Sequence, residues 1–225
     1  MCVSSGTSSL FQRWNLQVRQ NYNLLTAEAL PSPTVLRVLL ISRSAPTSGP
    51  NSTHILSRMF TNTQELQSAL QTYAAQKSLA TTSLDTTSNS NATTTGFRVE
   101  VTHSVFGSLS YLDQVRSMSE TSIVIGMHGA GIASSIHMPV GTALCCGIVE
   151  IFPEGEFKTI KGYSSLARKL GHQYERINVA PAHTSLQGTT VAPELVTTAL
   201  DSLISKIVKA RGSCFLPEVL NVPYL

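Results

Sequence analysis

The sequence predicts an α/β protein built on a doubly wound parallel sheet, and two observations carry this prediction. Short apolar runs rich in β-branched residues alternate with segments whose apolar residues recur every three or four positions. The order is one helix followed by repeated strand–helix units, which favours parallel strands with helices on both faces. The 225 residues suffice for one large domain with a sizeable core.

The expected strands are apolar runs with turn-forming residues on both sides. They cover residues 35–42, 97–101, 122–126, 148–152 and 173–179. The expected helices cover residues 10–30, a segment that begins at Asn62, residues 109–119, a short turn at 130–136, residues 163–170, and a segment that begins at Pro193. Asn62 is predicted to cap its helix, with Glu65 as the capping-box partner three residues later.

Two segments fall outside the alternating pattern. Residues 1–33 are expected to form an N-terminal helix and linker, in which Leu10 and Trp14 belong to an apolar face that needs a partner; the Rossmann-like domain is then expected over 34–225. Residues 78–96 consist mostly of Ser, Thr and Asn, which predicts a disordered surface insertion. His172 and His183 are interpreted as surface residues.

The stretch 121–153 gives the clearest indication of a binding site. A β-branched strand leads into the tetrapeptide His128-Gly129-Ala130-Gly131, and a short helix is expected next. Glycines permit positive φ or close approach, and backbone N–H groups at the start of a helix favour an anion such as a phosphate. The same turn also occurs in α/β domains that bind nothing.

Polar residues near this turn extend the prediction to a nucleotide. Glu150 follows Gly129 by about twenty residues, the spacing at which a carboxylate accepts from ribose hydroxyls. Arg43 ends the first strand and Arg58 lies in the loop after it, where guanidinium groups suit a diphosphate. His128 can donate to a phosphate or act as an acid or base near neutral pH. Each also has an ordinary structural explanation: solvated arginines, a structural carboxylate and a capping or core histidine.

Several motifs occur in one order along the chain. They are Leu40-Ile41-Ser42-Arg43, residues 62–66, residues 127–132, residues 138–141, Val149-Glu150-Ile151-Phe152-Pro153 and residues 163–174. Together they resemble the donor-binding half of family 61 glycosyltransferases, over roughly residues 37–178. The resemblance implies the nucleotide-sugar domain of a GT-B-type glycosyltransferase. Residues 142–147 look like a short insertion relative to that family.

The resemblance also implies a reaction and a set of residues. The reaction is metal-independent, inverting transfer of GlcNAc, xylose or arabinose from a UDP-sugar to a hydroxyl of a glycan or glycoprotein, with no cofactor. His128 is expected to be catalytic through contact with phosphate or sugar; the role of base is less favoured, because the acceptor of a two-domain glycosyltransferase binds largely to the other domain. Gln114 corresponds to a polar residue that the family places near the donor, although a solvent-facing glutamine is the simpler interpretation. The implied nucleotide-sugar-binding residues are Arg43, Arg58, Gln114, His128, Gly129, Ala130, Gly131 and Glu150.

Charge and hydropathy exclude some partners and indicate a location. The net charge of +3 is too small and scattered for a nucleic-acid partner. No run approaches the ~18 apolar residues of a membrane span, and the N-terminus lacks a secretory signal. Membrane attachment is therefore expected only through a segment absent from this sequence. The resemblance implies the Golgi or endoplasmic reticulum lumen, with which glycosylation sequons at Asn51 and Asn91 agree.

Two other classes of function stay open. A Rossmann oxidoreductase that binds NAD(P) would also use a Gly-x-Gly turn and a later carboxylate. Its fingerprint, however, follows the first strand and has a third glycine or alanine where this chain has Ser134. The other alternative is a degenerate transferase domain that keeps the fold and has no activity.

Overall fold

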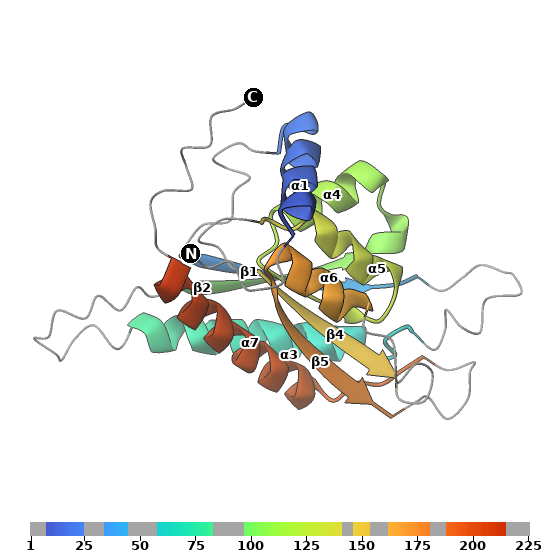
Figure 1. The fold of residues 1–225 in the computed structure, drawn as a ribbon. Coiled ribbons are helices and arrows are strands. Elements are labelled where there is room, and N and C mark those ends of the chain that lie inside the picture. The colour runs from blue at the N-terminus through green and yellow to red at the C-terminus, as the bar shows by residue number, and fades with distance from the viewer. Residues whose placement is uncertain are drawn as a thin grey trace, which may run out of the picture.

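In the computed structural model, the described residues include five parallel strands that form one sheet with helices on both faces (Figure 1). The structure describes residues 8–24, 34–44, 58–82, 97–140, 146–153, 162–180 and 188–214. The strand order is β2-β1-β3-β4-β5. The strands are β1 (Val35–Ser42), β2 (Arg98–Val105), β3 (Ile123–Met127), β4 (Gly147–Pro153) and β5 (Gln173–Val179). This confirms the predicted doubly wound parallel α/β fold.

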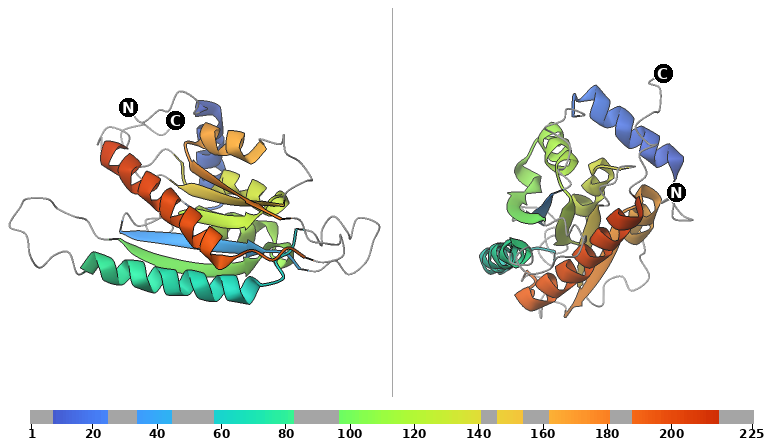
Figure 2. Two further views of the ribbon diagram at one scale, coloured as in Figure 1. Left: turned by 90° about the horizontal axis from the view of Figure 1, so that it is seen from below. Right: turned by 90° about the vertical axis from the view of Figure 1, so that its left-hand side faces the viewer.

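Helices cover the two faces of the sheet in separate groups (Figure 2). One face carries α3 (Thr63–Thr82) and α7 (Pro193–Cys214), and the other carries α4 (Tyr111–Ser119), α5 (Ala130–Ala133) and α6 (Gly162–Leu170). Side chains that alternate along a strand enter different cores: Ile123 and Ile125 pack on the α3 side, and Val124 on the opposite side. Both faces of the central strands β1, β3 and β4 are largely buried, so these strands are nearly continuous apolar runs that the sequence located well. The edge strand β2 is more exposed and more polar, and it runs to Val105, beyond the predicted end at residue 101.

The first helix, α1 (Ser9–Asn21), corrects the prediction for residues 10–30. It ends at Asn21, and residues 25–33 lie outside the described ranges. Its buried side chains are the polar Asn15 and Arg19, whereas Leu10 and Trp14 are 73% and 41% exposed. The Asn15 amide donates to the carbonyl oxygen of Met138 (2.9 Å), which follows a 3₁₀ turn, η3 (Ser134–His137). Helix ends present unpaired carbonyls, so a polar contact forms where an apolar one was expected.

The helix α3 also differs from the prediction in two details. It continues to Thr82, so the first five residues of the predicted insertion 78–96 are helical; Ser78 Oγ donates to the Ala74 carbonyl (2.9 Å) inside the helix. Residues 83–96 lie outside the described ranges. Asn62 does precede the helix, and its amide donates to the predicted partner Glu65 Oε2 (2.9 Å). Its oxygen, however, accepts from the Val191 N–H (3.2 Å) in place of a helix N–H, and its amide also donates to the Val191 carbonyl (2.8 Å).

His172 is buried, and its interpretation as a surface residue is wrong. It lies between α6 and β5 with 7% of its surface exposed, and it hydrogen-bonds the backbone of Ser135. Within the described residues its Nε2 has no hydrogen-bond partner. Burial disfavours the charged imidazolium and lowers the pKa of His172 from 6.5 to about 4. His183 lies outside the described ranges.

The buried imidazole of His172 is expected to make the protein sensitive to acid. Between pH 6.5 and 4 the unfolded chain binds a proton at this residue and the folded chain does not. The stabilisation is therefore complete above pH 6.5 and decreases as pH falls toward 4, by roughly 3 kcal/mol at most. Urea unfolding at pH 7 and pH 5 measures this loss. His172→Asn should show a smaller loss than the native protein, and an equal loss would contradict the assignment.

Candidate functional site

Arg43 and the turn from His128 to Gly131 lie at the carboxyl edge of the sheet, where the strand order reverses, whereas Glu150 lies in the middle of β4. The chain leaves β1 for β2 on one side and returns to β3 on the other. In open α/β sheets this reversal creates a crevice outside the strand ends, and ligands bind there. Arg43 directly follows β1, and the turn from His128 to Gly131 directly follows β3. Residues far apart in the sequence thus meet at one crevice.

The turn after β3 depends on Gly129. Its backbone has φ 134° and ψ −165°, a conformation that residues with a side chain almost never adopt. A Cβ added to Gly129 would lie 2.0 Å from Nη2 of Arg43. The Arg43 guanidinium therefore occupies the space that the missing side chain leaves. His128 N donates to the Ile151 carbonyl (2.8 Å), which extends the β3–β4 pairing to the edge of the turn.

The segment after the turn is helical over residues 130–137, which agrees with the one or two helical turns predicted for residues 130–136. The α-helical part, α5, is a single turn, and η3 continues it in 3₁₀ geometry. A single turn aligns few peptide dipoles, so its contribution to binding an anion is small. Among the described residues, the positive charge at this edge comes mainly from the side chains of Arg43 and Arg58.

Arg43 and Arg58 place two positive charges near one another. Burial lowers the pKa of Arg43, the nearby Arg58 lowers it further, and Tyr163 partly offsets both effects. Within the described residues Arg43 has no hydrogen-bond or ion-pair partner, although it is half-buried. A guanidinium stays charged at neutral pH, and a partly buried charge is costly unless it is paired. An anion at this crevice would relieve that cost.

The segment that carries Arg58 is held in place by backbone pairing. Thr61 N donates to the Thr189 carbonyl (3.1 Å), and Thr189 N donates to the Met59 carbonyl (2.6 Å). Gly188 allows this approach, because a Cβ there would lie 2.8 Å from the Met59 oxygen. The pairing fixes Arg58 on the same side of the sheet edge as the residues that precede α7.

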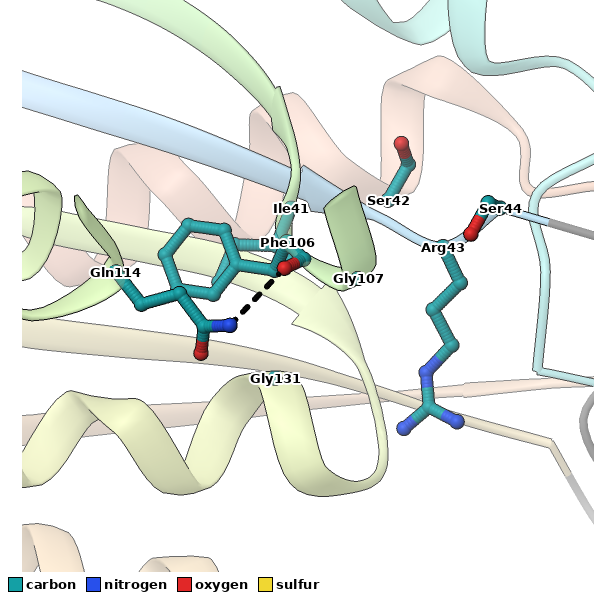
Figure 3. Close-up of a pocket in the computed structure, with 8 residues that line it drawn as sticks. All are labelled: Ile41, Ser42, Arg43, Ser44, Phe106, Gly107, Gln114 and Gly131. Carbon is teal, nitrogen blue, oxygen red and sulfur yellow. Dashed lines mark hydrogen bonds between the residues drawn. The ribbon is translucent and has the colours of Figure 1, made fainter. Parts of the chain in front are cut away.

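A pocket of about 260 Å³ opens beside Arg43 (Figure 3). It lies between the end of β1, a 3₁₀ turn named η2 (Phe106–Ser108), α4 and α5. Gln114 Nε2 donates to the carbonyls of Phe106 (3.1 Å) and Leu109 (3.2 Å), which fixes the orientation of the amide. Gln114 is thus half-buried at the pocket and is not simply solvent-facing. The lining residues are Ile41, Ser42, Arg43, Ser44, Phe106, Gly107, Gln114 and Gly131.

Glu150 lies in a second cluster next to the turn. Its side chain is buried within β4, where Oε1 pairs with His128 Nδ1 and Oε2 accepts from the Tyr174 hydroxyl. Both carboxylate oxygens are therefore in use. The predicted contact between Glu150 and a ribose stays a prediction, and it would require one of these bonds to open or be shared.

Tyr163 and Tyr174 are site residues that sequence reasoning did not single out. The Tyr163 ring lies 5.3 Å from the His128 ring, and burial and Glu150 raise its pKa while the two arginines lower it. Tyr163 therefore faces both the arginine pair and the Glu150 cluster. The available signal was the segment 163–174, in which one tyrosine lies at the start of a short helix and another follows that helix.

Two further features concern metals and membranes. Within the described ranges, no group of three or more His, Cys, Asp and Glu side chains is placed to hold a metal ion. Among the helices of the described residues, none combines the length and apolar composition needed to cross a membrane.

The fold and the site together define a Rossmann-like α/β domain with a cationic crevice at its topological switch point. The sequence profile described as Glycosyltransferase 61 matches residues 2–145, more than half of the chain. The chain belongs to the glycosyltransferase 61 family, so a sugar donor and an acceptor follow in general. The match includes Arg43, Arg58, Gln114 and the glycine turn, and ends before Glu150. No curated protein matches the chain.

Proposed function

We propose that this glycosyltransferase binds a UDP-sugar at the β1–β3 crevice and transfers the sugar, with inversion and without a metal, to a hydroxyl of a glycan or glycoprotein. The observation that carries the proposal is the half-buried Arg43, which lies against Gly129 at the switch point with no partner among the described residues. A bound diphosphate supplies a negatively charged partner for this guanidinium.

The diphosphate is the leaving group of such a transfer, and negative charge grows on it as the bond to the sugar breaks. That charge is stabilised by two arginines at fixed positions. Arg43 directly follows β1, and Arg58 lies on the segment that pairs with Thr189. Preorganised charges of this kind usually make the largest contribution to catalysis. Tyr163, which faces both arginines, adds a hydroxyl donor on the same side.

The pocket beside Arg43 suits the nucleoside part of the donor. Its volume of about 260 Å³ lies below the roughly 300–1,000 Å³ of pockets that enclose a whole ligand, so it takes one portion of the molecule. The Phe106 ring and Ile41 give it apolar walls. The Gln114 amide uses its NH₂ on two backbone carbonyls, which leaves Oε1 as an acceptor for the N3–H of uracil.

The remaining parts of the proposal concern the sugar, the acceptor and the compartment. The sugar is GlcNAc, xylose or arabinose, and the acceptor is a protein or polysaccharide hydroxyl in the Golgi or endoplasmic reticulum lumen. These choices are supported by family membership and by the two sequons.

Calorimetric titration of the chain with UDP, CDP and NAD, each with and without EDTA, tests the proposal. Saturable UDP binding that survives EDTA is expected. CDP should bind about tenfold more weakly, because its N3 is an acceptor that cannot pair with Gln114 Oε1. NAD binding without UDP binding would favour an oxidoreductase. Binding of none of the three nucleotides would favour a domain without catalytic function.

A further inference from the structure

Glu150 connects three adjacent strands through its two carboxylate oxygens. Only 3% of its surface is exposed, and its partners are His128 at the end of β3 and Tyr174 on β5. A buried carboxylate is costly unless its oxygens accept hydrogen bonds, and here one bond is made from each side. The three side chains therefore form one hydrogen-bonded unit.

The unit determines which nitrogen of His128 carries a proton. Burial and the Glu150 carboxylate raise the pKa of Tyr174, so its hydroxyl stays protonated and donates. An ionised carboxylate only accepts, so Nδ1 of His128 is the atom that carries the proton toward Glu150. In the neutral imidazole the lone pair then lies on Nε2. The rings of Phe152 (4.5 Å) and Tyr163 (5.3 Å) flank the imidazole and restrict its rotation.

We propose that Tyr174 is a positioning residue for sugar transfer: it holds Glu150, which fixes His128 in the Nδ1–H tautomer, and His128 takes the proton of the acceptor hydroxyl at Nε2. This inference rests on the proposed function and adds a role to a residue outside the predicted set. It makes His128 the base of the reaction.

The acceptor O–H bond breaks, and its proton moves to Nε2 of His128. The acceptor oxygen forms a bond to the anomeric carbon while the bond from that carbon to the diphosphate oxygen breaks. The bonding electrons leave with UDP, whose charge Arg43 neutralises, and the imidazolium later releases its proton to water.

The variant Tyr174→Phe tests the proposal, because it removes the hydroxyl and keeps the ring. Nitrogen NMR of the His128 imidazole, assigned with His128→Gln, should show protonated Nδ1 in the native protein and a mixture of tautomers in Tyr174→Phe. The kcat should fall about tenfold while the KM for the donor and the affinity for UDP change less than twofold. Tyr111→Phe is the matched control, because that hydroxyl contacts a different histidine, His137 (3.3 Å).

Separate outcomes distinguish this inference from the proposed function. If the native protein binds no UDP, the proposed function fails, while the NMR result still decides the tautomer. If native transfer occurs and Tyr174→Phe keeps both the native tautomer and the native kcat, the positioning role is wrong. Equal losses of kcat, UDP affinity and thermal stability would also overturn it, as a purely structural effect. Glu150→Gln provides a second variant, which should shift the tautomer in the same direction.

Discussion

Replacing Arg43 with methionine is expected to weaken UDP binding about 100-fold. A guanidinium that meets a phosphate makes charge-assisted, often bidentate hydrogen bonds, each contributing about 1.5–3 kcal/mol. Methionine keeps an unbranched apolar stem at this position and removes every donor. Loss of about 3 kcal/mol corresponds to a hundredfold change in affinity. Calorimetric titration with UDP measures it directly.

The same substitution should leave folding stability unchanged or slightly increase it. Arg43 is half-buried, lies near Arg58 and has no partner within the described residues, so the folded protein gains little from its charge. Removing a partly buried, unpaired charge is often neutral or stabilising. Arg13→Met on the exposed side of α1 is the matched control and should leave UDP binding at the native level. Native UDP affinity in Arg43→Met would exclude the crevice as the diphosphate site.

The sequence predicted the fold well because burial on both faces leaves a strong local pattern. Every residue of β3 and β4 is buried, so these strands appear as uninterrupted apolar runs. The strand order follows less directly, because it depends on which edges pair. The right-handed crossover of parallel strands nevertheless limits the choices, and it placed Arg43 and the glycine turn at one edge.

The parts of the site that depend on cross-strand register could not be predicted in the same way. Tyr174 pairs with Ile148 on β4, and its hydroxyl reaches the Glu150 carboxylate two residues further on. No local pattern in the sequence contains this contact. Likewise, the guanidinium of Arg43 fills the space beside Gly129. This contact depends on the register between β1 and β3.

The N-terminal helix shows a different limit, because hydrophobic periodicity assumes that the apolar side of a helix is the buried side. In α1 the buried residues are Asn15 and Arg19, and Arg19 donates to the carbonyl of Ser119 (3.5 Å). The neighbouring segments present backbone carbonyls that require donors. Tertiary hydrogen bonding therefore overrode the local pattern.

Replacing Gly129 with alanine is expected to lower both stability and UDP affinity. The backbone at φ 134° and ψ −165° costs about 1–3 kcal/mol for a residue with a side chain. The added Cβ would also lie 2.0 Å from Arg43 Nη2, and because that atom ends a flexible side chain, the guanidinium moves away. We expect UDP affinity to fall about tenfold or more, since the displaced guanidinium loses a charge-assisted hydrogen bond to the diphosphate. Thermal unfolding and calorimetry measure the two effects separately.

Gly171→Ala separates backbone strain from the effect on Arg43. Gly171 has φ 81° at the end of α6, so an alanine there is strained as well, by roughly 1–2 kcal/mol. Both variants should therefore lose stability, whereas only Gly129→Ala should lose UDP affinity. The double variant with Arg43→Met completes the test. If Gly129 acts through the position of Arg43, the double variant binds UDP no more weakly than Arg43→Met alone, because the same interaction cannot be lost twice. Additive losses would instead indicate that the backbone of the turn binds the diphosphate itself.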